Sequence, residues 1–146
     1  MPGETDLQTL LASMRPRLDD RVFVFASVKR GQPLPQDAGI LMRFFEREGT
    51  TLVLPIEDAT LLGIECTFPC RMITLDIHSS LEAVGFLAAI LPRLAAAGIG
   101  VNPVSAFHHD HLFVPSDRAE DALAILKDIA SEAQAGSIGR GPVASN

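Results

Sequence analysis

Residues 73–114 read ITLDIHSSLEAVGFLAAILPRLAAAGIGVNPVSAFHHDHLFV, and this stretch decides the fold. Its first residues alternate strictly between two faces, with Ile73, Leu75 and Ile77 on one of them, which is the period of a strand. Apolar residues then recur near helical spacing, which predicts a helix over about 80–97 that ends at Gly98. Residues 99–107 and 111–114 predict a hairpin. The order strand, helix, hairpin indicates an α+β unit.

The rest of the chain contains elements of the same kinds. The expected elements before this stretch are a helix over 6–14, a strand over 21–28, a strand over 51–54, a helix over 57–62 ended by Gly63, and a long extended segment over 64–77. A capping box at 117–120 opens a last helix. The Gly, Ser and Ala composition after it predicts a flexible tail over 134–146.

Written in order, these elements form two incomplete βαββαβ units. The segment 64–77 serves both units, and each unit lacks one terminal strand, so we expect the two to complete each other in one interlocked body. The strand over 21–28 is apolar on both faces, so the other unit or a second copy of the chain must cover its second face. We expect a homodimer that forms through the outer edge of the second unit, around the hairpin 101–114.

Composition excludes several classes of function. The 146 residues fit one compact domain or two small ones that share a core. The net charge is −6, with 12 basic residues scattered among 18 acidic ones, which disfavours binding to nucleic acid or to an anionic membrane. Residues 1–10 lack a signal-peptide pattern, and the most apolar stretch, 83–91, is far shorter than the ~20 residues that span a bilayer, so we expect a cytoplasmic protein.

The two cysteines do not suggest a disulfide or a zinc site. Cys66 and Cys70 lie four residues apart in an extended segment, which separates their Cα atoms by about 13 Å, too far for a disulfide unless Pro69 bends the chain sharply. Two thiols alone also cannot complete a zinc site. We expect both to be buried and inert.

The run HSSLEAVGFLAAILPRLAAAGIGVNPVSAFHHDHLFVP at 78–115, followed by AEDALAILKDI at 119–129, resembles the ACT domain. It resembles most closely the small stand-alone bacterial proteins with tandem ACT-like units. Gly-Phe-Leu at 85–87 matches the glycine, hydrophobic residue and leucine at the start of the ACT helix, and GIGVN at 98–102 matches the turn into the next strand. The second unit, 71–133, carries most of the match, and the first, 1–70, resembles the family chiefly through REGTTLVLPIEDA.

The resemblance implies a fold of two interlocked ferredoxin-like (βαββαβ) ACT units, with antiparallel sheets and helices on one face. It also implies a protein that binds an amino acid or a small carboxylate, regulates rather than catalyses, and uses no cofactor. Aligned on Gly85, the ligand-holding positions of the family fall on Ser80 and Glu82. The chain has Ala83 and Val84 where the family's loop has an Asp/Asn-x-Pro-Gly pattern.

Five residues form the predicted ligand site: Ser79, Ser80, Glu82, Asn102 and Asp76. Residues 79–82 are an S-x-x-E capping box, which either only caps the expected helix or also contacts a ligand at its N-terminus. In the second case the Ser80 hydroxyl turns toward the ligand, and Glu82 pairs with a ligand ammonium by leaving its capping role. Asp76 is either a solvated or capping carboxylate or a partner for an α-amino group. Asn102 serves either turn chemistry or the ligand carboxylate.

The sequence HHDH at 108–111 contains metal-ligand residue types, but its spacing argues against a metal site. Neighbours on an extended chain point to opposite faces, so only alternate members converge, and His78 would have to be the third ligand. We therefore interpret 108–111 as a polar hairpin tip, with metal binding, ligand contact or pH sensing as alternatives. The sequence contains no nucleophile elbow, P-loop or dinucleotide fingerprint, which argues against an enzyme.

The sequence thus predicts a non-catalytic ACT-type sensor for an amino acid or small carboxylate. The main alternative is a ligand-free interaction or dimerisation module, and the third is an enzyme or metal-binding protein that uses the histidines. A closed polar pocket beside Ser80 favours the sensor, whereas a filled or fully open helix start favours the alternative.

Overall fold

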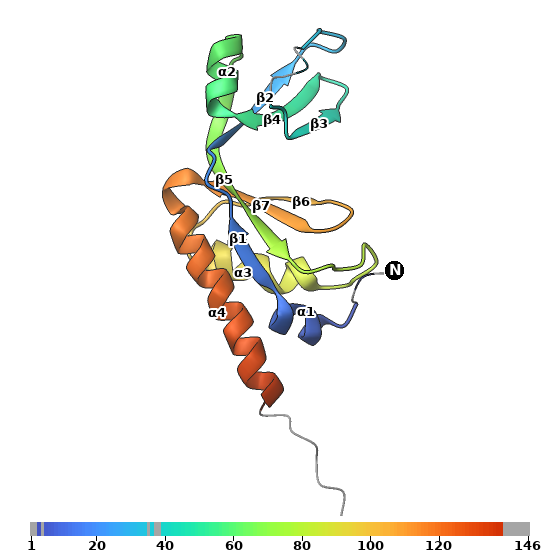
Figure 1. The fold of residues 1–146 in the computed structure, drawn as a ribbon, viewed down its shortest axis with the longest axis vertical. Coiled ribbons are helices and arrows are strands. Elements are labelled where there is room, and N and C mark those ends of the chain that lie inside the picture. The colour runs from blue at the N-terminus through green and yellow to red at the C-terminus, as the bar shows by residue number, and fades with distance from the viewer. Residues whose placement is uncertain (1–2, 4, 35, 37–38, 139–146) are drawn as a thin grey trace, which may run out of the picture.

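The described residues of the computed structural model, 3, 5–34, 36 and 39–138, form one antiparallel sheet of seven strands with helices packed on it (Figure 1). The strands are β1 (Arg15–Leu18), β2 (Phe23–Val28), β3 (Met42–Phe45), β4 (Thr50–Pro55), β5 (Cys66–Asp76), β6 (Asn102–Ser105) and β7 (Asp110–Pro115). The helices are α1 (Leu7–Ser13), α2 (Ile56–Leu62), α3 (Phe86–Ala96) and α4 (Ala119–Ile138), with a short 3-10 turn η1 (Ser116–Arg118) before α4.

The long strand β5 joins the two units. Its first part pairs with β2, its second part pairs with β1 on the same edge, and its other edge pairs with β7 from Cys70 to Leu75. The strand order is therefore β3-β4-β2-β5-β7-β6, with β1 beside the end of β5. This arrangement confirms that one extended segment serves both units, and it confirms the predicted α+β ferredoxin-like fold.

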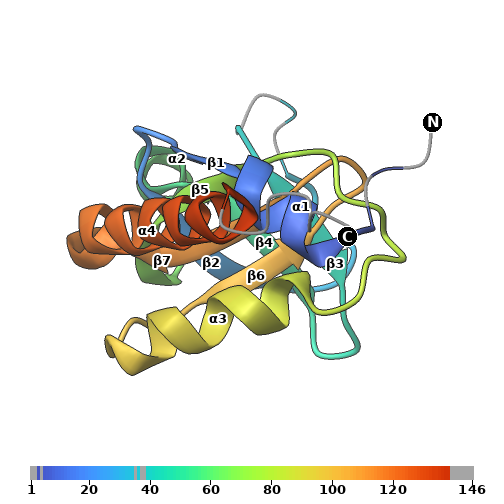
Figure 2. The same ribbon diagram turned by 90° about the horizontal axis from the view of Figure 1, so that it is seen from below.

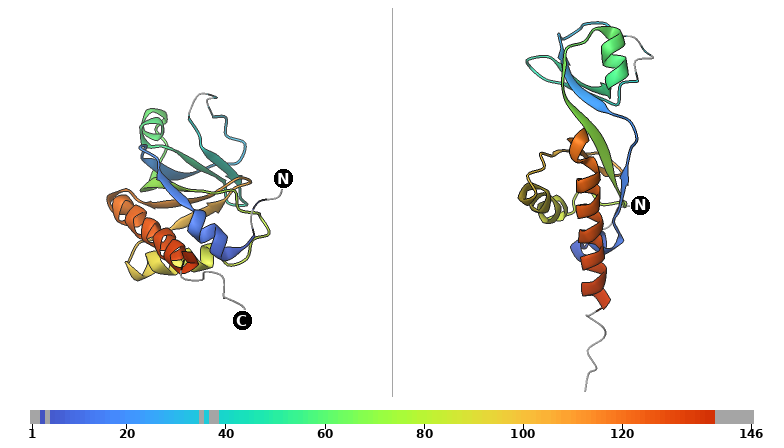
Figure 3. Two further views of the ribbon diagram at one scale, coloured as in Figure 1. Left: turned by 60° about the horizontal axis from the view of Figure 1, so that its bottom comes forward. Right: turned by 90° about the vertical axis from the view of Figure 1, so that its left-hand side faces the viewer.

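The helices cover the outer face of the sheet. Helices α1, α3 and α4 pack over the second unit (Figure 2), where Ile73, Leu75 and Leu112 are fully buried beneath them. Helix α2 covers the first unit, at the opposite end of the molecule from α1 (Figure 3), and packs on Val24 and Leu54. Burial of these apolar side chains stabilises each unit against its own helices.

The inner face of the sheet is covered within the chain. Phe23, Val53, Cys70, Met72 and Phe113 come from four different strands and are buried together there. Strands β3 and β6 lie at the two ends of the strand order, yet both line one apolar cavity of about 190 Å³. The sheet is therefore curled, which brings its two ends together. The strand predicted over 21–28 is apolar on both faces, and we expected either the other unit or a second copy of the chain to cover its second face. The structure shows the other unit of the same chain in that position.

Two strands were missed by the sequence patterns. Strand β1 contains Arg15, Pro16 and Arg17, so it shows no apolar alternation, and it is held by pairing with Ile73–Asp76 of β5. Strand β3 is only four residues long and mostly exposed, and it pairs with β4. Both strands depend on a neighbour that is distant in sequence, which local patterns do not reveal.

The helix expected over 80–97 begins only at Phe86, so the predicted capping box at 79–82 is wrong. The Ser80 hydroxyl accepts a hydrogen bond from the Glu82 N–H at 3.1 Å, which makes a local turn that competes with the helix. Gly85 then adopts φ 87°, a left-handed conformation that interrupts the helical path and suits glycine. Residues 79–85 are therefore a loop that leads to α3.

The tail predicted over 134–146 is wrong for its first part, because α4 continues to Ile138. Two amide side chains fasten the end of this helix to α1: Gln8 donates to the Ala133 carbonyl at 2.7 Å, and Gln134 donates to the Ala12 carbonyl at 2.8 Å. These contacts explain why a Gly- and Ser-containing sequence stays helical. Residues 139–146 lie outside the described part of the chain.

The two cysteines differ in environment. Cys70 is fully buried and donates to the Phe23 carbonyl at 3.4 Å, and burial raises the pKa of its thiol to about 12. The inert interpretation therefore holds for Cys70. Cys66 is exposed, contrary to expectation, because it lies near the start of β5, where the burial pattern is mostly exposed.

We expect Phe113→Ala to lower the free energy of unfolding by about 3–5 kcal/mol, because it empties the space between the units. The Phe113 ring lies edge-on to those of Phe23, at 6.2 Å, and Phe25, at 5.6 Å. Chemical denaturation measures the loss. The control is Phe107→Ala, whose side chain is 70 % exposed and whose loss should change stability by less than about 0.5 kcal/mol. Similar losses in both variants would contradict the described core.

Candidate functional site

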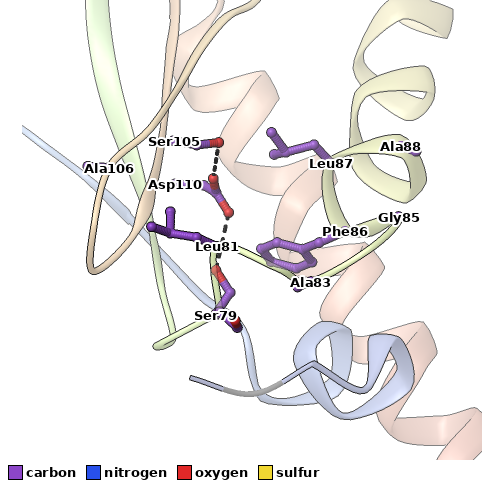
Figure 4. Close-up of a pocket in the computed structure, with 11 residues that line it drawn as sticks. Ser79, Leu81, Ala83, Gly85, Phe86, Leu87, Ala88, Ser105, Ala106 and Asp110 are labelled. Carbon is purple, nitrogen blue, oxygen red and sulfur yellow. Dashed lines mark hydrogen bonds between the residues drawn. The ribbon is translucent and has the colours of Figure 1, made fainter. Parts of the chain in front are cut away.

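A pocket of about 190 Å³ lies where the loop 79–85 meets the start of α3 and the β6–β7 hairpin (Figure 4). The loop, the first turn of α3 and the two hairpin strands each contribute part of its wall. The lining residues are Ser79, Ser80, Leu81, Ala83, Gly85, Phe86, Leu87, Ala88, Ser105, Ala106 and Asp110. The pocket thus combines polar groups on the hairpin side with apolar side chains on the helix side.

The carboxylate of Asp110 is the most distinctive group in this pocket. It is only 8 % exposed, and it accepts hydrogen bonds from the hydroxyls of Ser105, at 2.5 Å, and Ser79, at 3.4 Å (Figure 4). No ion pair among the described residues includes Asp110. A buried carboxylate held by neutral donors alone still favours a cation beside it.

The start of α3 supplies the opposite polarity. The N-cap residue Gly85 provides no side-chain hydrogen bond to the helix, and the first turn contains no acidic residue. The first N–H groups of a helix have no intrahelical acceptor and carry partial positive charge. Because Phe86, Leu87 and Ala88 line the pocket, this positive end and the Asp110 carboxylate border the same space.

The structure brings two of the five predicted site residues to this pocket. Ser79 and Ser80 line it, whereas Glu82, Asp76 and Asn102 do not. Glu82 is exposed and lines a neighbouring pocket of about 270 Å³. Asp76 lies 3.7 Å from His109 Nε2, and Asn102 is exposed at the opposite end of β6 from Ser105.

Sequence reasoning missed Asp110 and Ser105 as pocket residues. A sequence signal for Asp110 was present in the second strand of the hairpin. Asp110, Leu112 and Val114 alternate along β7 and therefore share one of its faces. All three are buried on the helix-covered side of the sheet. An acidic residue at the apolar phase of a strand is a candidate for a buried functional carboxylate.

Two histidines of the hairpin, His109 and His111, contact different groups. His109 Nδ1 lies 3.2 Å from the Ile77 carbonyl, while His111 Nδ1 lies 2.9 Å from the Thr74 hydroxyl. Within the described ranges, no group of three or more His, Cys, Asp or Glu side chains is arranged to hold a metal ion. Burial, followed by the charge of His109, lowers the pKa of His111, with Arg17 acting in the same direction and Asp110 opposing it.

We predict that His111 makes the protein less stable as the pH falls. Its lowered pKa means that the unfolded chain takes up the proton first, so the free energy of unfolding should decrease once the pH drops below about 6.5. The variant His111→Gln, which cannot titrate, should show a smaller decrease between pH 7 and 5 in denaturant titrations. The control is His108→Gln, on an exposed side chain. An unchanged decrease in His111→Gln would contradict the burial effect.

A polar hairpin tip that holds no metal should be insensitive to chelation. We expect EDTA to leave the melting temperature unchanged and the purified protein to carry no stoichiometric zinc by elemental analysis. One zinc per chain, lost in His109→Ala, would show instead that the histidines form a metal site.

No helix in the described part of the chain is both long and apolar enough to cross a membrane.

A search of curated proteins found no match to the chain. Among solved structures, a Vibrio cholerae protein described as of unknown function and possibly a transport protein is 38 % identical, with a TM-score of 0.75, and the match covers 85 % of this chain and 95 % of that one.

More distant structures share the fold. An Agrobacterium tumefaciens protein is 16 % identical, with a TM-score of 0.67, over 80 % of this chain and 89 % of that one. The regulatory subunit of aspartate kinase from Thermus thermophilus, in its ligand-free form, is 10 % identical, with a TM-score of 0.57, over 82 % and 98 % of the two chains. Two family profiles described as ACT domain match residues 2–71 and 67–128. The chain therefore belongs to the ACT domain family, with two ACT units in tandem.

Proposed function

We propose that this protein is a non-catalytic regulatory sensor that binds a free amino acid or a related small carboxylate in the pocket beside α3. The observation that carries the proposal is the buried Asp110 carboxylate, which has two hydroxyl donors and lies in the same pocket as an uncapped helix start. A closed polar pocket beside Ser80 is the feature expected of a sensor; the pocket that Ser80 lines is partly open, and its polar wall is what supports the sensor over a ligand-free module.

The two ends of an amino acid match the two sides of this pocket. The ammonium group would approach Asp110, where a cation adds charge-assisted hydrogen bonds to those from Ser79 and Ser105. The carboxylate would accept hydrogen bonds from the first backbone N–H groups of α3, where the helix dipole favours negative charge. A ligand that lacks either group would satisfy only one side.

The size and lining of the pocket restrict the ligand further. Its volume of about 190 Å³ is below the roughly 300–1,000 Å³ of sites for drug-sized molecules, so a nucleotide-sized ligand is disfavoured. Leu81, Phe86 and Leu87 lie around it in Figure 4. These side chains favour a small or apolar amino-acid side chain.

The distant structural relatives are consistent with this role. Two carry descriptions as a regulatory subunit or a C-terminal regulatory domain of aspartate kinase. At 10–13 % identity they support the fold, and their regulatory function reaches this chain only by analogy. The pocket chemistry is therefore the stronger support.

A ligand-free interaction module is a second candidate, and one observation favours it. Leu81 and Phe107 are 66 % and 70 % exposed and line the pocket or its neighbour, and Val84, in the same loop as Leu81, is 83 % exposed. Large apolar side chains grouped at a surface often mark a protein contact. Such a contact is also compatible with a sensor whose partner responds to the bound ligand.

A thermal-shift screen against the twenty amino acids tests the proposal. An external dye is needed because the chain has no Trp or Tyr. A ligand at 100 times its dissociation constant should add about 2.7 kcal/mol to the stability. We expect Asp110→Asn to abolish this shift, because the uncharged amide no longer attracts the ammonium group, while the exposed Asp128→Asn should keep it.

Analogues of the amino acid found in the screen sharpen this test. Its N-acetyl derivative lacks the ammonium charge and its amide lacks the carboxylate, so both should lose the shift. Absence of any shift with all twenty amino acids would contradict an amino-acid sensor, and a shift that survives Asp110→Asn would contradict the proposed site.

A further inference from the structure

We propose that the cavity on the inner face of the sheet is a second ligand site, which binds a small uncharged molecule with an apolar body of about benzene size and one hydrogen-bond acceptor. This inference does not rest on the proposed amino-acid site. The inner cavity lies where β3 of the first unit faces β6 and β7 of the second (Figure 1). Its volume is about 190 Å³, and its apolar lining residues are Leu41, Met42, Met72, Val104, Ala106 and Phe113.

The inner cavity and the pocket beside α3 lie on opposite faces of the β6–β7 hairpin. Neighbouring residues of a strand point to opposite faces, so Asp110 of β7 lines the pocket beside α3 while His111 lines the inner cavity. Ala106, just after β6, borders both. None of the polar residues assigned to the amino-acid site lines the inner cavity, so the two sites differ in chemistry as well as in place.

The volume and walls of the inner cavity suit a molecule of this size. An engineered cavity of about 150 Å³ with apolar walls is large enough to bind benzene. Met72 and Phe113 are buried, whereas Leu41 is 40 % exposed, so a ligand can enter beside Leu41 without opening the sheet. Met42 and Met72 have flexible, unbranched side chains, which let the wall fit ligands of slightly different shape.

The imidazole of His111 is the polar group of this wall, and Thr74 fixes its tautomer. His111 Nδ1 lies 2.9 Å from the hydroxyl of Thr74, a residue that is only 3 % exposed. Among the described residues this hydroxyl has no other hydrogen-bond partner. If Nδ1 carried the proton, the buried O–H would have no acceptor, which is costly. The hydroxyl therefore donates to Nδ1, and the proton of the neutral ring is on Nε2.

The Nε2–H group is available to a ligand. It has no hydrogen-bond partner within the described part of the chain, and no buried side-chain nitrogen or oxygen there lacks a partner, so Nε2 is accessible rather than enclosed. Burial is the largest cause that lowers the pKa of His111, which keeps the ring neutral at pH 7. A neutral donor in an apolar wall matches one acceptor, such as a carbonyl oxygen.

An anion fits the inner cavity less well than an uncharged acceptor. Among the described residues, no Lys or Arg lines the cavity, and His111 is neutral. A carboxylate would lose the hydration of a full charge in exchange for a single hydrogen bond, and that exchange is unfavourable. The ligand class is therefore a small aromatic or branched aliphatic molecule with one uncharged acceptor, for example a ketone.

Methionine methyl signals test occupancy of the inner cavity directly. The chain has four methionines, of which Met42 and Met72 line the cavity and Met14 is buried beneath the helices instead. We would titrate the full chain, labelled with ¹³C at the methionine methyl groups, with acetophenone and record NMR spectra. We expect saturable shifts of the Met42 and Met72 signals, with a dissociation constant of about 1 mM or lower, and an unmoved Met14 signal. Shifts that do not saturate, or that are as large at Met14, would overturn the proposal.

Two molecules of nearly the same shape as acetophenone separate the hydrogen bond from the apolar fit. Isopropylbenzene has no acceptor, and benzoate carries a charge. The double variant Thr74→Val with His111→Leu removes both partners of the hydrogen bond and leaves neither unpaired. It should bind acetophenone about fivefold to tenfold more weakly and isopropylbenzene at least as tightly as the unmodified chain does. The exposed control His108→Leu should change neither affinity.

The contrary results are distinct. Unchanged acetophenone affinity in the double variant would overturn the role of His111, and benzoate that binds as tightly as acetophenone would overturn the uncharged class. Val104→Phe fills the inner cavity and should abolish the shifts, so shifts that persist in it would overturn the location. Asp110→Asn should leave the acetophenone shifts intact, because it alters only the pocket beside α3. Their loss in Asp110→Asn would place acetophenone in that pocket and overturn the second site.

Discussion

The structure depends on one shared strand. Strand β5 is 11 residues long, about twice the usual length, and its backbone pairs with β1, β2 and β7. Neither unit can satisfy the hydrogen bonds of its sheet without it. The inner apolar cluster reinforces this dependence, because Cys70 and Met72 of β5 pack with side chains of both units. The two ACT units therefore form one body rather than two domains on a linker.

The candidate site follows from the register of this strand. Leu75 of β5 lies opposite Asp110 of β7, which in turn lies opposite Ser105 of β6. This ladder turns Asp110 to the helix-covered face, beside the loop that leads to α3. A shift of one residue would turn the carboxylate to the inner, apolar face. The same pairing that holds the units together thus positions the proposed ammonium-binding group.

Sequence patterns predicted the fold well where they were local. The alternation at Ile73 and Leu75, the short helix ended by Gly63 and the hairpin before α4 all correspond to observed elements. Strands β1 and β3 were not predictable in this way, because pairing with distant strands, rather than their own residues, makes them extended.

The site was predicted in part for a related reason. Ser80 was identified from its position before the helix glycine and Ser79 from the capping pattern, although the capping role expected of Ser79 was wrong. The capping pattern at 79–82 is a real local signal, but the turn at Ser80 and the left-handed Gly85 delay the helix. Asp110 was classified with the hairpin histidines, because its burial depends on the β5–β7 pairing.

Native-state hydrogen exchange measures the central claim most directly. If β5 makes the two units one cooperative body, its paired amides in Cys66–Asp76 and those of β4 and β7 should share the global unfolding free energy as denaturant is added. If β2 and β4 instead exchanged through an opening of clearly lower free energy, while β5 and β7 stayed protected, the units would be independent and the shared-strand account would be contradicted.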